Sequence, residues 1–423
     1  MGSAARYRAL KGMPDVLPDE AFRRQRIDRK AREIFDLFGY REIRTPILEE
    51  TEVFTRSIGA DTDIVEKEMY TFEDRGGKSV SMRPEGTAPI IRSYIEHGWH
   101  NSPDIVKLFY SGPMFRGERP QKGRLRQFHQ IGAEMIGGSD PLIDAELIST
   151  LHMLFTCLGL EGFSIVLNSL GCAEDRKIYK KRLAGYLRNR KKDLCDNCVR
   201  RAGSNVLRVL DCKNPGCREV VSGAPSIRKS LCDDCSAFYE RLKSLLNDTD
   251  ISFTEKGDLV RGLDYYTGTI FEVVHQGLGA QDALAAGGRY DDLSAEMGGS
   301  PRGATGYAIG VERLLLALGD EAFGKKEAPA LVIPMDADLK REAFSTVCFL
   351  RDRGISCDMD LAGRSFKAQL RKANREDRRF VLIIGEDEVR EGMVTLKDMS
   401  EGTQTMMERE KAVEALRKTS GLS

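Results

Sequence analysis

The strongest constraint on the fold is the stretch Phe109–Gly138, in which two β-strand patterns flank a loop dense in arginine and lysine. Apolar and small residues dominate both ends, whereas Pro120 and Gly123 prevent regular structure between them. The sequence therefore predicts a hairpin with a long cationic loop. Such a hairpin fits a polyanion on one side and a small polar substrate on the other.

A solvated hairpin tip is the simpler explanation for this loop, because charge runs usually lie on the surface. Three polar residues argue against it. Arg116, Gln130 and Glu134 fall inside or beside the apolar strand segments rather than at the tip. Because buried charges are costly unless they meet partners, the pattern indicates a functional site on the hairpin.

The hairpin sequence FRGE followed by RLRQFHQIGAE resembles motif 2 of class II aminoacyl-tRNA synthetases, in the form found in histidyl-tRNA synthetases. Other marks of that family follow in its order along nearly the whole chain: Lys11–Glu20, Arg83–Ala88, Leu259–Val273, Gly287–Leu293 and Gly306–Leu315. The resemblance implies a homodimeric ligase that activates histidine with ATP and Mg²⁺. It also implies that this ligase transfers the activated histidine to the 3′ end of tRNA(His).

The length of 423 residues is too great for one ordinary core, so two or three domains are expected. The resemblance implies an α/β chain whose class II catalytic domain, with an antiparallel sheet, spans 1–169 and 251–325. A helical, cysteine-rich insertion is expected over 170–250. The strand and helix alternation over 328–423 predicts a small α/β domain with a mixed sheet, which resembles the anticodon-binding module of the family.

Net charge excludes a globally basic nucleic-acid-binding protein, because Lys+Arg and Asp+Glu both number 65. Affinity for tRNA must therefore come from local patches such as Arg364–Arg379, with seven basic and two acidic residues. A solvated helix face is the alternative for that segment. The sequence has no long apolar run and no signal-peptide pattern, so we expect a cytoplasmic protein with no membrane partner.

Amino-acid activation concentrates negative charge at phosphorus, so fixed cations should do most of the catalytic work. Arg116 and Arg313 are expected around the triphosphate, because guanidinium groups bind phosphate through paired hydrogen bonds. The alternative for Arg313 is a surface ion-pair partner. The resemblance places Arg261 near the α-phosphate. Glu118 is expected on the adenine side, and Phe128 offers a stacking surface.

Specificity for histidine requires a polar pocket, since buried groups left unpaired by the wrong amino acid cost strongly. The resemblance assigns seven residues to histidine: Glu85 and Thr87 at its ammonium group with Gly86 between them, Glu134 and Tyr266 at its ring, and Gln130 and Tyr265 nearby. The segment Arg83–Thr87 also fits the start of a helix, and both roles can hold together.

Two further contacts follow from the resemblance. Arg119, Gln121, Lys122 and Arg124 on the motif 2 loop are expected to meet the acceptor end of the tRNA. The predicted helix Asp19–Phe38 and the strand region Tyr40–Ile47 match motif 1, which forms the dimer interface in the family. A plain core helix explains that motif 1 pattern equally well.

The insertion departs from the family, which does not in general need structural zinc. Two CxxC pairs predict a tetrahedral site, because each pair can direct two thiolates at one ion. We therefore expect structural Zn²⁺ held by Cys195, Cys198, Cys232 and Cys235, with Cys212 or Cys217 able to replace one ligand. Histidine activation is expected to survive its loss. Free cysteines in a poorly ordered insertion are the alternative.

Two other functions compete with the ligase. A regulatory paralogue in histidine biosynthesis typically lacks the anticodon-type domain and has eroded motif arginines, whereas this chain keeps Arg116, Arg261 and Arg313. A non-catalytic RNA-binding module does not need Glu85, Glu134 and the tyrosine pair together. The sequence therefore favours the ligase.

Overall fold

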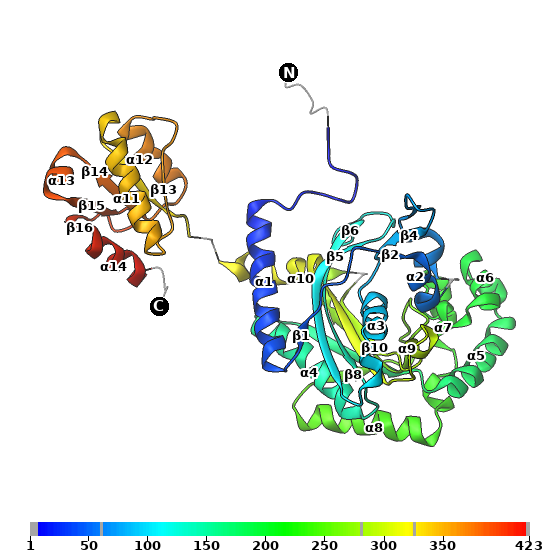
Figure 1. Cartoon of the computed structure of the whole chain (residues 1–423). Coiled ribbons are helices and arrows are strands. Elements are labelled where there is room, and N and C mark those ends of the chain that lie inside the picture. The colour runs from blue at the N-terminus through cyan, green and yellow to red at the C-terminus, as the bar shows by residue number, and fades with distance from the viewer. Residues whose placement is uncertain (1–6, 60–61, 280–281, 325–326, 420–423) are drawn as a thin grey trace. The chain divides into compact units, whose positions relative to one another are not determined.

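In the computed structural model, the described residues are 7–59, 62–279, 282–324 and 327–419, and they form two compact units divided after Gly324 (Figure 1). Within these residues, no helix is both long and apolar enough to cross a membrane. Each unit has its own sheet and its own buried core.

The first unit is built on an eight-stranded sheet. Its strands, in spatial order, are β1 (Arg41–Glu42), β5 (Val106–Phe115), β6 (Gln127–Ile136), β11 (Ala304–Gly310), β10 (Ala283–Arg289), β9 (Thr267–His275), β7 (Phe163–Ser169) and β8 (Phe253–Glu255). Neighbours are antiparallel except at the two edges, where β1 pairs with β5 and β8 pairs with β7 in parallel. The predicted antiparallel catalytic sheet is therefore confirmed.

The predicted hairpin is formed by β5 and β6, which pair without interruption from Val106 opposite Ile136 to Phe115 opposite Gln127. Successive side chains of a strand point to opposite faces of the sheet. Ile131, Ala133 and Met135 accordingly enter the core of one face. Gln130 and Glu134 are directed to the other face, where the candidate site lies.

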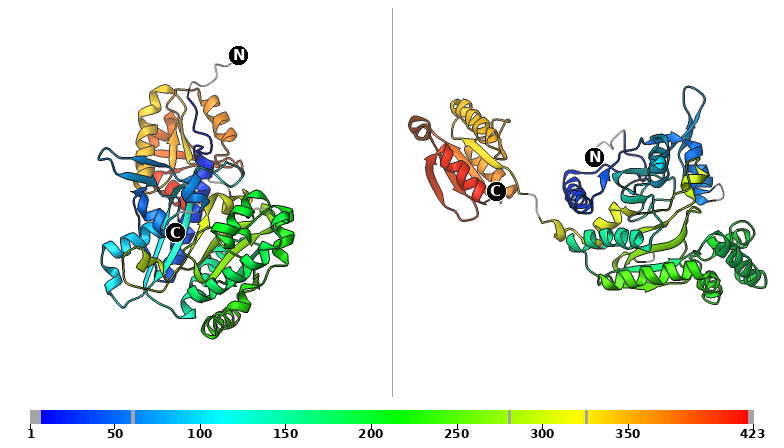
Figure 2. Two further views of the ribbon diagram at one scale, coloured as in Figure 1. Left: turned by 90° about the vertical axis from the view of Figure 1, so that its right-hand side faces the viewer. Right: turned by 60° about the horizontal axis from the view of Figure 1, so that its bottom comes forward.

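Four helices cover the first face: α1 (Pro18–Leu37), α4 (Pro141–Cys157), α8 (Asp233–Asp248) and α10 (Val311–Leu318). Helix α8 lies along α4 (Figures 1 and 2) and buries Tyr239, Leu242 and Leu246 in the same core as α4. The last helix of the predicted insertion thus shares the core of the catalytic sheet.

The second face is covered by α3 (Thr87–Glu96) and by the insertion. The insertion contains α5 (Ala173–Arg188), α6 (Asp196–Ser204) and α7 (Pro215–Ser222), with 3₁₀ segments at Lys191–Asp193, Val206–Val209 and Ile227–Ser230. A small sheet lies beside α3, in the order β2 (Leu48–Glu50), β4 (Ser79–Met82), β3 (Thr71–Glu73), together with α2 (Thr51–Ile58), a π-helical turn Ile64–Glu68 and α9 (Leu293–Glu296). The cysteine-rich segment is therefore helical and packed.

The second unit is a five-stranded mixed sheet with helices. Its order is β13 (Cys357–Met359), β12 (Ala330–Pro334), β14 (Phe380–Ile384), β15 (Met393–Asp398), β16 (Gln404–Glu408). Its helices are α11 (Lys340–Asp352), α12 (Phe366–Arg375), α13 (Glu386–Glu391) and α14 (Arg409–Thr419), with a 3₁₀ segment at Ala337–Leu339. In the described part of the first unit, further 3₁₀ segments lie at Trp99–Asn101, Gln276–Leu278 and Glu321–Phe323. The predicted mixed sheet is confirmed, and β16 is an additional strand.

Candidate active site

Three arginines from distant parts of the sequence line one pocket on the second face of the large sheet. Arg116 follows β5, Arg261 lies in the loop before β9, and Arg313 lies in the first turn of α10. Glu118, Arg124, Phe128 and Gln130 also line this pocket. Three guanidinium groups around one pocket make a site for a polyanion.

Two contacts hold the side chain of Arg116 in place. Its Nε donates a hydrogen bond of 2.9 Å to the carbonyl oxygen of Pro84. Its guanidinium lies over the ring of Phe128, 5.3 Å from the ring centroid. These two contacts fix the direction of the side chain before any substrate binds.

Arg313 is partly buried and donates to the carbonyl oxygen of Ala283. Burial, reinforced by the nearby positive charge of Arg124, lowers its pKa to about 10. The side chain is still protonated at neutral pH. An anion placed between Arg313 and Arg124 relieves their mutual repulsion, which favours phosphate binding here.

Arg261 is directed by an ion pair with Glu272 on β9. Its Nε is buried and has no hydrogen-bond partner among the described residues. The sequence analysis did not identify Glu272 as a site residue. Its position in the alternating strand Thr269–His275 could have done so, because Glu272 lies on the opposite face of the sheet from Phe271 and Val273, which belong to the first core.

Glu134 is the centre of a buried polar cluster that it forms with Thr87 and Tyr290. Its carboxyl group is fully buried, accepts a hydrogen bond of 2.7 Å from the hydroxyl of Thr87 and accepts another from the hydroxyl of Tyr290. Burial raises the pKa of Glu134 to about 8, despite these two hydrogen bonds. A ligand that brings a positive charge or N–H donors to this carboxyl group would therefore ionise it.

Glu85 lies at the N-terminus of α3, as the helix-start interpretation predicts. Its two carboxylate oxygens accept hydrogen bonds of 2.7 Å from the backbone N–H of Thr87 and 2.9 Å from that of Ala88. Burial raises the pKa of Glu85. Thr87 thus connects the two carboxyl groups, because its backbone binds Glu85 and its side chain binds Glu134.

Aromatic rings and glycines surround this polar cluster. The rings of Tyr265 and Tyr266 are 4.8 Å apart, and Tyr265 meets the ring of Tyr290 edge-on at 5.7 Å. A side chain at Gly86 would overlap the ring of Tyr110, and one at Gly306 would overlap the carboxyl group of Glu134. Glycine is therefore required at both positions.

Two polar atoms in this region have no hydrogen-bond partner among the described residues. They are Gln130 Oε1 and the hydroxyl of Tyr110, and both are buried. Buried polar groups are nearly always paired, so a polar ligand is the natural partner for them. Tyr110 and Tyr290 were missed as site residues, although Tyr290 stands inside the family-like segment Gly287–Leu293.

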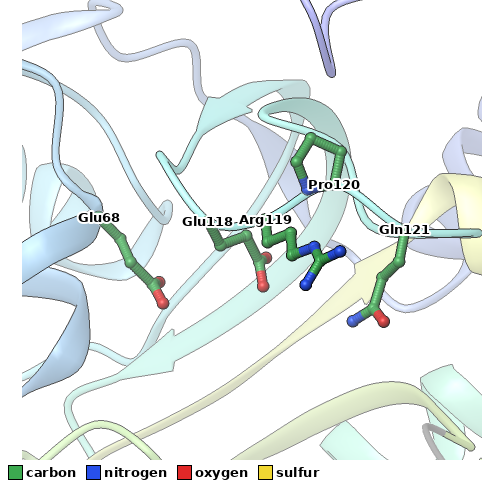
Figure 3. Close-up of a pocket in the computed structure, with 5 residues that line it drawn as sticks. All are labelled: Glu68, Glu118, Arg119, Pro120 and Gln121. Atoms are coloured by element: carbon green, nitrogen blue, oxygen red, sulfur yellow. The ribbon is translucent and has the colours of Figure 1, made fainter.

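The motif 2 loop borders a second, adjoining pocket. Side chains of Glu68, Glu118, Arg119 and Gln121 extend into the same space there (Figure 3). Lys122 and Gly123 form the tight turn at the loop tip, where Gly123 has a φ of +73°. Arg119, Gln121 and Lys122 are exposed, whereas Arg124 turns back to bind Glu118 at 3.0 Å.

The cysteines require a correction of the predicted metal site. The structure separates the two CxxC pairs: Cys195 and Cys198 lie with Cys212 and Cys217, whereas Cys232 and Cys235 lie with Cys172 and Asp175. The cause is local, since Cys232 is the N-cap of α8 and its backbone N–H donates to Asp175 of α5 at 2.9 Å. The spacing Cys212-x₄-Cys217 is also within the usual range for paired zinc ligands, and this signal was not used.

Comparison with known proteins agrees with the motifs. Residues 12–314 match the histidyl-tRNA synthetase family model, and residues 330–419 match the anticodon binding domain model. A histidine–tRNA ligase of Syntrophotalea carbinolica is 46% identical over 93% of this chain and 94% of its own length, and one of Geobacter metallireducens is 48% identical over 94% and 96%. A crystal structure of apo S. aureus histidyl-tRNA synthetase is 33% identical, with a TM-score of 0.81 over 97% of this chain and 100% of its own. The chain therefore belongs to the histidyl-tRNA synthetase family.

Proposed function

We propose that this chain is a histidine–tRNA ligase, which forms histidyl-adenylate and pyrophosphate from histidine and ATP and then esterifies the 3′ end of tRNA(His). The observation that carries the proposal is the convergence of three arginines on one pocket, together with a buried polar cluster centred on Glu134 on the same face of the sheet. The pocket suits a triphosphate, and the polar cluster suits an amino acid with a polar ring. The regulatory and RNA-binding alternatives need neither arrangement.

In this proposal, the arginines stabilise the charge that develops when the histidine carboxylate attacks the α-phosphate. Arg116 and Arg313 hold the triphosphate, and Arg261 faces the α-phosphate, with Glu272 fixing its direction. Fixed cations aimed at developing charge need no reorganisation during the reaction, which is why they lower the barrier. Glu118 and Phe128 are assigned to the adenosine side, with the ring of Phe128 available for stacking.

Histidine is placed with its side chain toward Glu134. Glu134 and Gln130 offer acceptors for the ring N–H groups and Tyr266 packs beside the ring, while Glu85, Gly86, Thr87 and Tyr265 border the ammonium end. A phenylalanine or leucine side chain brings no N–H donor to Glu134 or to the unpartnered Oε1 of Gln130, and buried acceptors that receive no matching donor cost enough to reject it. The histidine-binding residues thus provide specificity by hydrogen bonding rather than by size.

Magnesium is proposed to enter as the MgATP complex. Mg²⁺ prefers oxygen ligands and usually binds one or two carboxylates together with substrate phosphates. Glu68 provides a carboxylate in the pocket that adjoins the triphosphate pocket. The ion supplies additional neutralisation of phosphate charge, and the arginines act at the same phosphates from the protein side.

Contacts with tRNA are assigned to two surfaces. The exposed residues Arg119, Gln121 and Lys122 are proposed to meet the acceptor end, and Arg124 does so only after leaving Glu118. In the second unit, Lys367, Arg371 and Arg375 of α12 are exposed, whereas Arg364, Arg378 and Arg379 are in ion pairs. Lys367, Arg371 and Arg375 are the proposed anticodon-side contacts.

A homodimer through the motif 1 region is proposed from the apolar residues that this region leaves exposed. Leu37, Ile47 and Leu48 are among the large apolar side chains that remain open to solvent. Large apolar side chains left open to solvent are candidates for burial in a protein–protein interface. Light scattering should give twice the chain mass, and Leu48→Asp should shift the protein toward the monomer. A monomeric wild type would contradict this.

The roles of the arginines are tested by Arg261→Ala in single-turnover adenylate formation. Loss of one electrostatic stabiliser should lower the chemical rate by roughly 10²–10³ while histidine affinity changes much less. Arg241→Ala is the matched control, because Arg241 is an exposed arginine paired with Asp140 outside the pocket residues. Normal chemistry with weakened histidine binding in Arg261→Ala would refute the assignment.

A further inference from the structure

We propose that Cys195, Cys198, Cys212 and Cys217 hold one structural Zn²⁺, and that this ion braces the loop that carries Arg261. The four thiols come from the start of α6, the segment after the Val206–Val209 turn, and α7. The bracing part of the proposal depends on the proposed role of Arg261, whereas the zinc site itself does not.

The sulfur positions fit a tetrahedral ion. All four Sγ atoms lie within 4.8 Å of one another, and those of Cys195 and Cys212 are 3.9 Å apart. Four thiolates at the usual Zn–S distance of about 2.3 Å lie about 3.8 Å apart. A disulfide needs about 2.05 Å between two sulfurs, so the spacing of Cys195 and Cys212 is that of shared ligands rather than bonded atoms.

The surroundings of the thiols are those of a closed structural site. Cys198 and Cys217 have no solvent-exposed surface, and the group packs against Leu194, Val209 and Val220. The backbone N–H of Cys195 donates a 3.2 Å hydrogen bond to the sulfur of Cys217. Hydrogen bonds to ligand atoms orient them, and a four-thiolate shell leaves no position open for substrate.

Local charge compensates the site. Zinc with four thiolates carries a net charge of −2. The segment Arg190–Arg218 contains eight basic residues and three acidic residues, which are Arg190, Lys191, Lys192, Arg200, Arg201, Arg208, Lys213 and Arg218 against Asp193, Asp196 and Asp211. Two of these cations, Arg201 and Arg208, share an ion pair with Asp63, and the segment keeps an excess of positive charge after this pairing. Such an excess favours an anionic metal centre over a neutral one.

The residues between the second and third ligand hold the active-site loop. Asn205 donates to both carboxylate oxygens of Asp264, at 2.9 and 3.0 Å. Arg208 donates to the carbonyl oxygen of Gly262 at 2.7 Å and to Asp63 at 3.0 Å. Gly262 directly follows Arg261. An ion that joins Cys198 to Cys212 therefore fixes the segment that positions Arg261, and its loss should lower activity rather than leave histidine activation unchanged.

The second group, Cys172, Asp175, Cys232 and Cys235, provides an internal comparison. Asp175 already accepts hydrogen bonds from the backbone N–H of Cys172 and of Cys232. This carboxylate joins the starts of α5 and α8 without a metal. The proposal therefore concerns only the four-thiol group.

The site is tested by metal analysis of the full-length protein purified without chelator. Cys195→Ser/Cys198→Ser and Cys212→Ser/Cys217→Ser should each lose the same single zinc per chain, and the combined variant should lose no more. Adding Cys212→Ser/Cys217→Ser to a Cys232→Ser/Cys235→Ser background should also remove one zinc. Cys157→Ser, at the exposed end of α4, is the matched control and should lose none.

A wild type without zinc, or a Cys212→Ser/Cys217→Ser variant with the wild-type zinc content, would overturn the site. The unsubstituted protein provides a second measurement that does not depend on variants folding. After its zinc is exchanged for Co²⁺, the absorption spectrum should show the thiolate charge-transfer and ligand-field bands of a tetrahedral thiolate site. Their absence would also count against the proposal.

The bracing role is tested by Arg208→Met, which should keep the zinc. Because a misplacement of about 1 Å in a catalytic group costs up to ~100-fold, the kcat for adenylate formation should fall by roughly 10- to 100-fold with a smaller change in the KM for histidine. Arg208→Lys should recover part of this loss. Arg228→Met, an insertion arginine paired with Glu255, is the control. A normal kcat in Arg208→Met with zinc retained would refute the bracing role and leave the zinc site standing.

Discussion

Glu134→Gln should make the ligand-free protein more stable at alkaline pH while impairing histidine activation. In the folded protein, burial raises the pKa of Glu134 from 4.5 to about 8. Between these values the unfolded chain has already released the proton while the folded chain keeps it. Stability therefore falls as pH rises through this window and levels off above the folded pKa. Glutamine keeps the shape and hydrogen-bonding capacity but has no proton to lose.

The size of the effect follows from the pKa difference. At about 1.4 kcal/mol per pKa unit, the interval from 4.5 to about 8 corresponds to about 5 kcal/mol. This is an upper bound, because an ionised carboxylate in the folded protein can recruit water. Near pH 9, we expect the free energy of unfolding of Glu134→Gln to exceed that of the wild type by a few kcal/mol. Near pH 5, we expect the two values to differ little.

The assay is urea unfolding of both proteins across this pH range, without substrates. Glu312→Gln is a control of opposite sign: although Glu312 is buried, its hydrogen bonds with His129 and its proximity to Arg24 lower its pKa. Glu312 therefore contributes stability above its unfolded pKa, and its replacement should destabilise the protein near pH 9. The explanation from the buried carboxyl group would fail if Glu134→Gln were no more stable to urea than the wild type near pH 9. It would also fail if the variant were more stable by the same amount at every pH.

Three further predictions concern the core and the tRNA contacts. Arg289→Met should lower the free energy of unfolding by about 3–5 kcal/mol in urea titrations, because it leaves the buried carboxylate of Asp144 without its 2.6 Å partner; a change below about 1 kcal/mol would contradict this. Deletion of Ala328–Ser423 should leave a chain that activates histidine but charges tRNA poorly, provided that light scattering shows an unchanged oligomeric state; equal charging by both forms would refute it. Arg119→Ala/Lys122→Ala should reduce the kcat/KM for tRNA and its dependence on salt while pyrophosphate exchange stays unchanged, and loss of exchange would count against the assignment of this loop.

The fold of the site could be predicted where local pattern and chemistry agree. The hairpin was predictable because strand alternation and the breakers Pro120 and Gly123 are local signals. Glu134 was predictable as a buried carboxyl group, because a charged residue inside an apolar strand needs partners. Its neighbours were harder to predict from the sequence. Tyr290, which binds Glu134, lies on a segment far along the chain, and no local pattern marks Tyr110.

The cysteine pairing shows the corresponding limit. The two CxxC pairs share a spacing but lie in different places, because α8 packs against α4 whereas the segment that follows α6 binds the active-site loop. Sequence spacing identifies which cysteines can form a pair of ligands, whereas tertiary packing decides which pairs meet. The contact of Arg208 with Gly262 has the same origin, since nothing local indicates that an insertion arginine holds a catalytic loop.

The central claim is tested most directly by ATP–pyrophosphate exchange with each amino acid in turn, using the full-length protein. Exchange should depend on histidine and should be lost in Glu134→Gln, which removes the carboxylate proposed to bind the imidazole. Exchange supported by another amino acid but not by histidine would contradict the account.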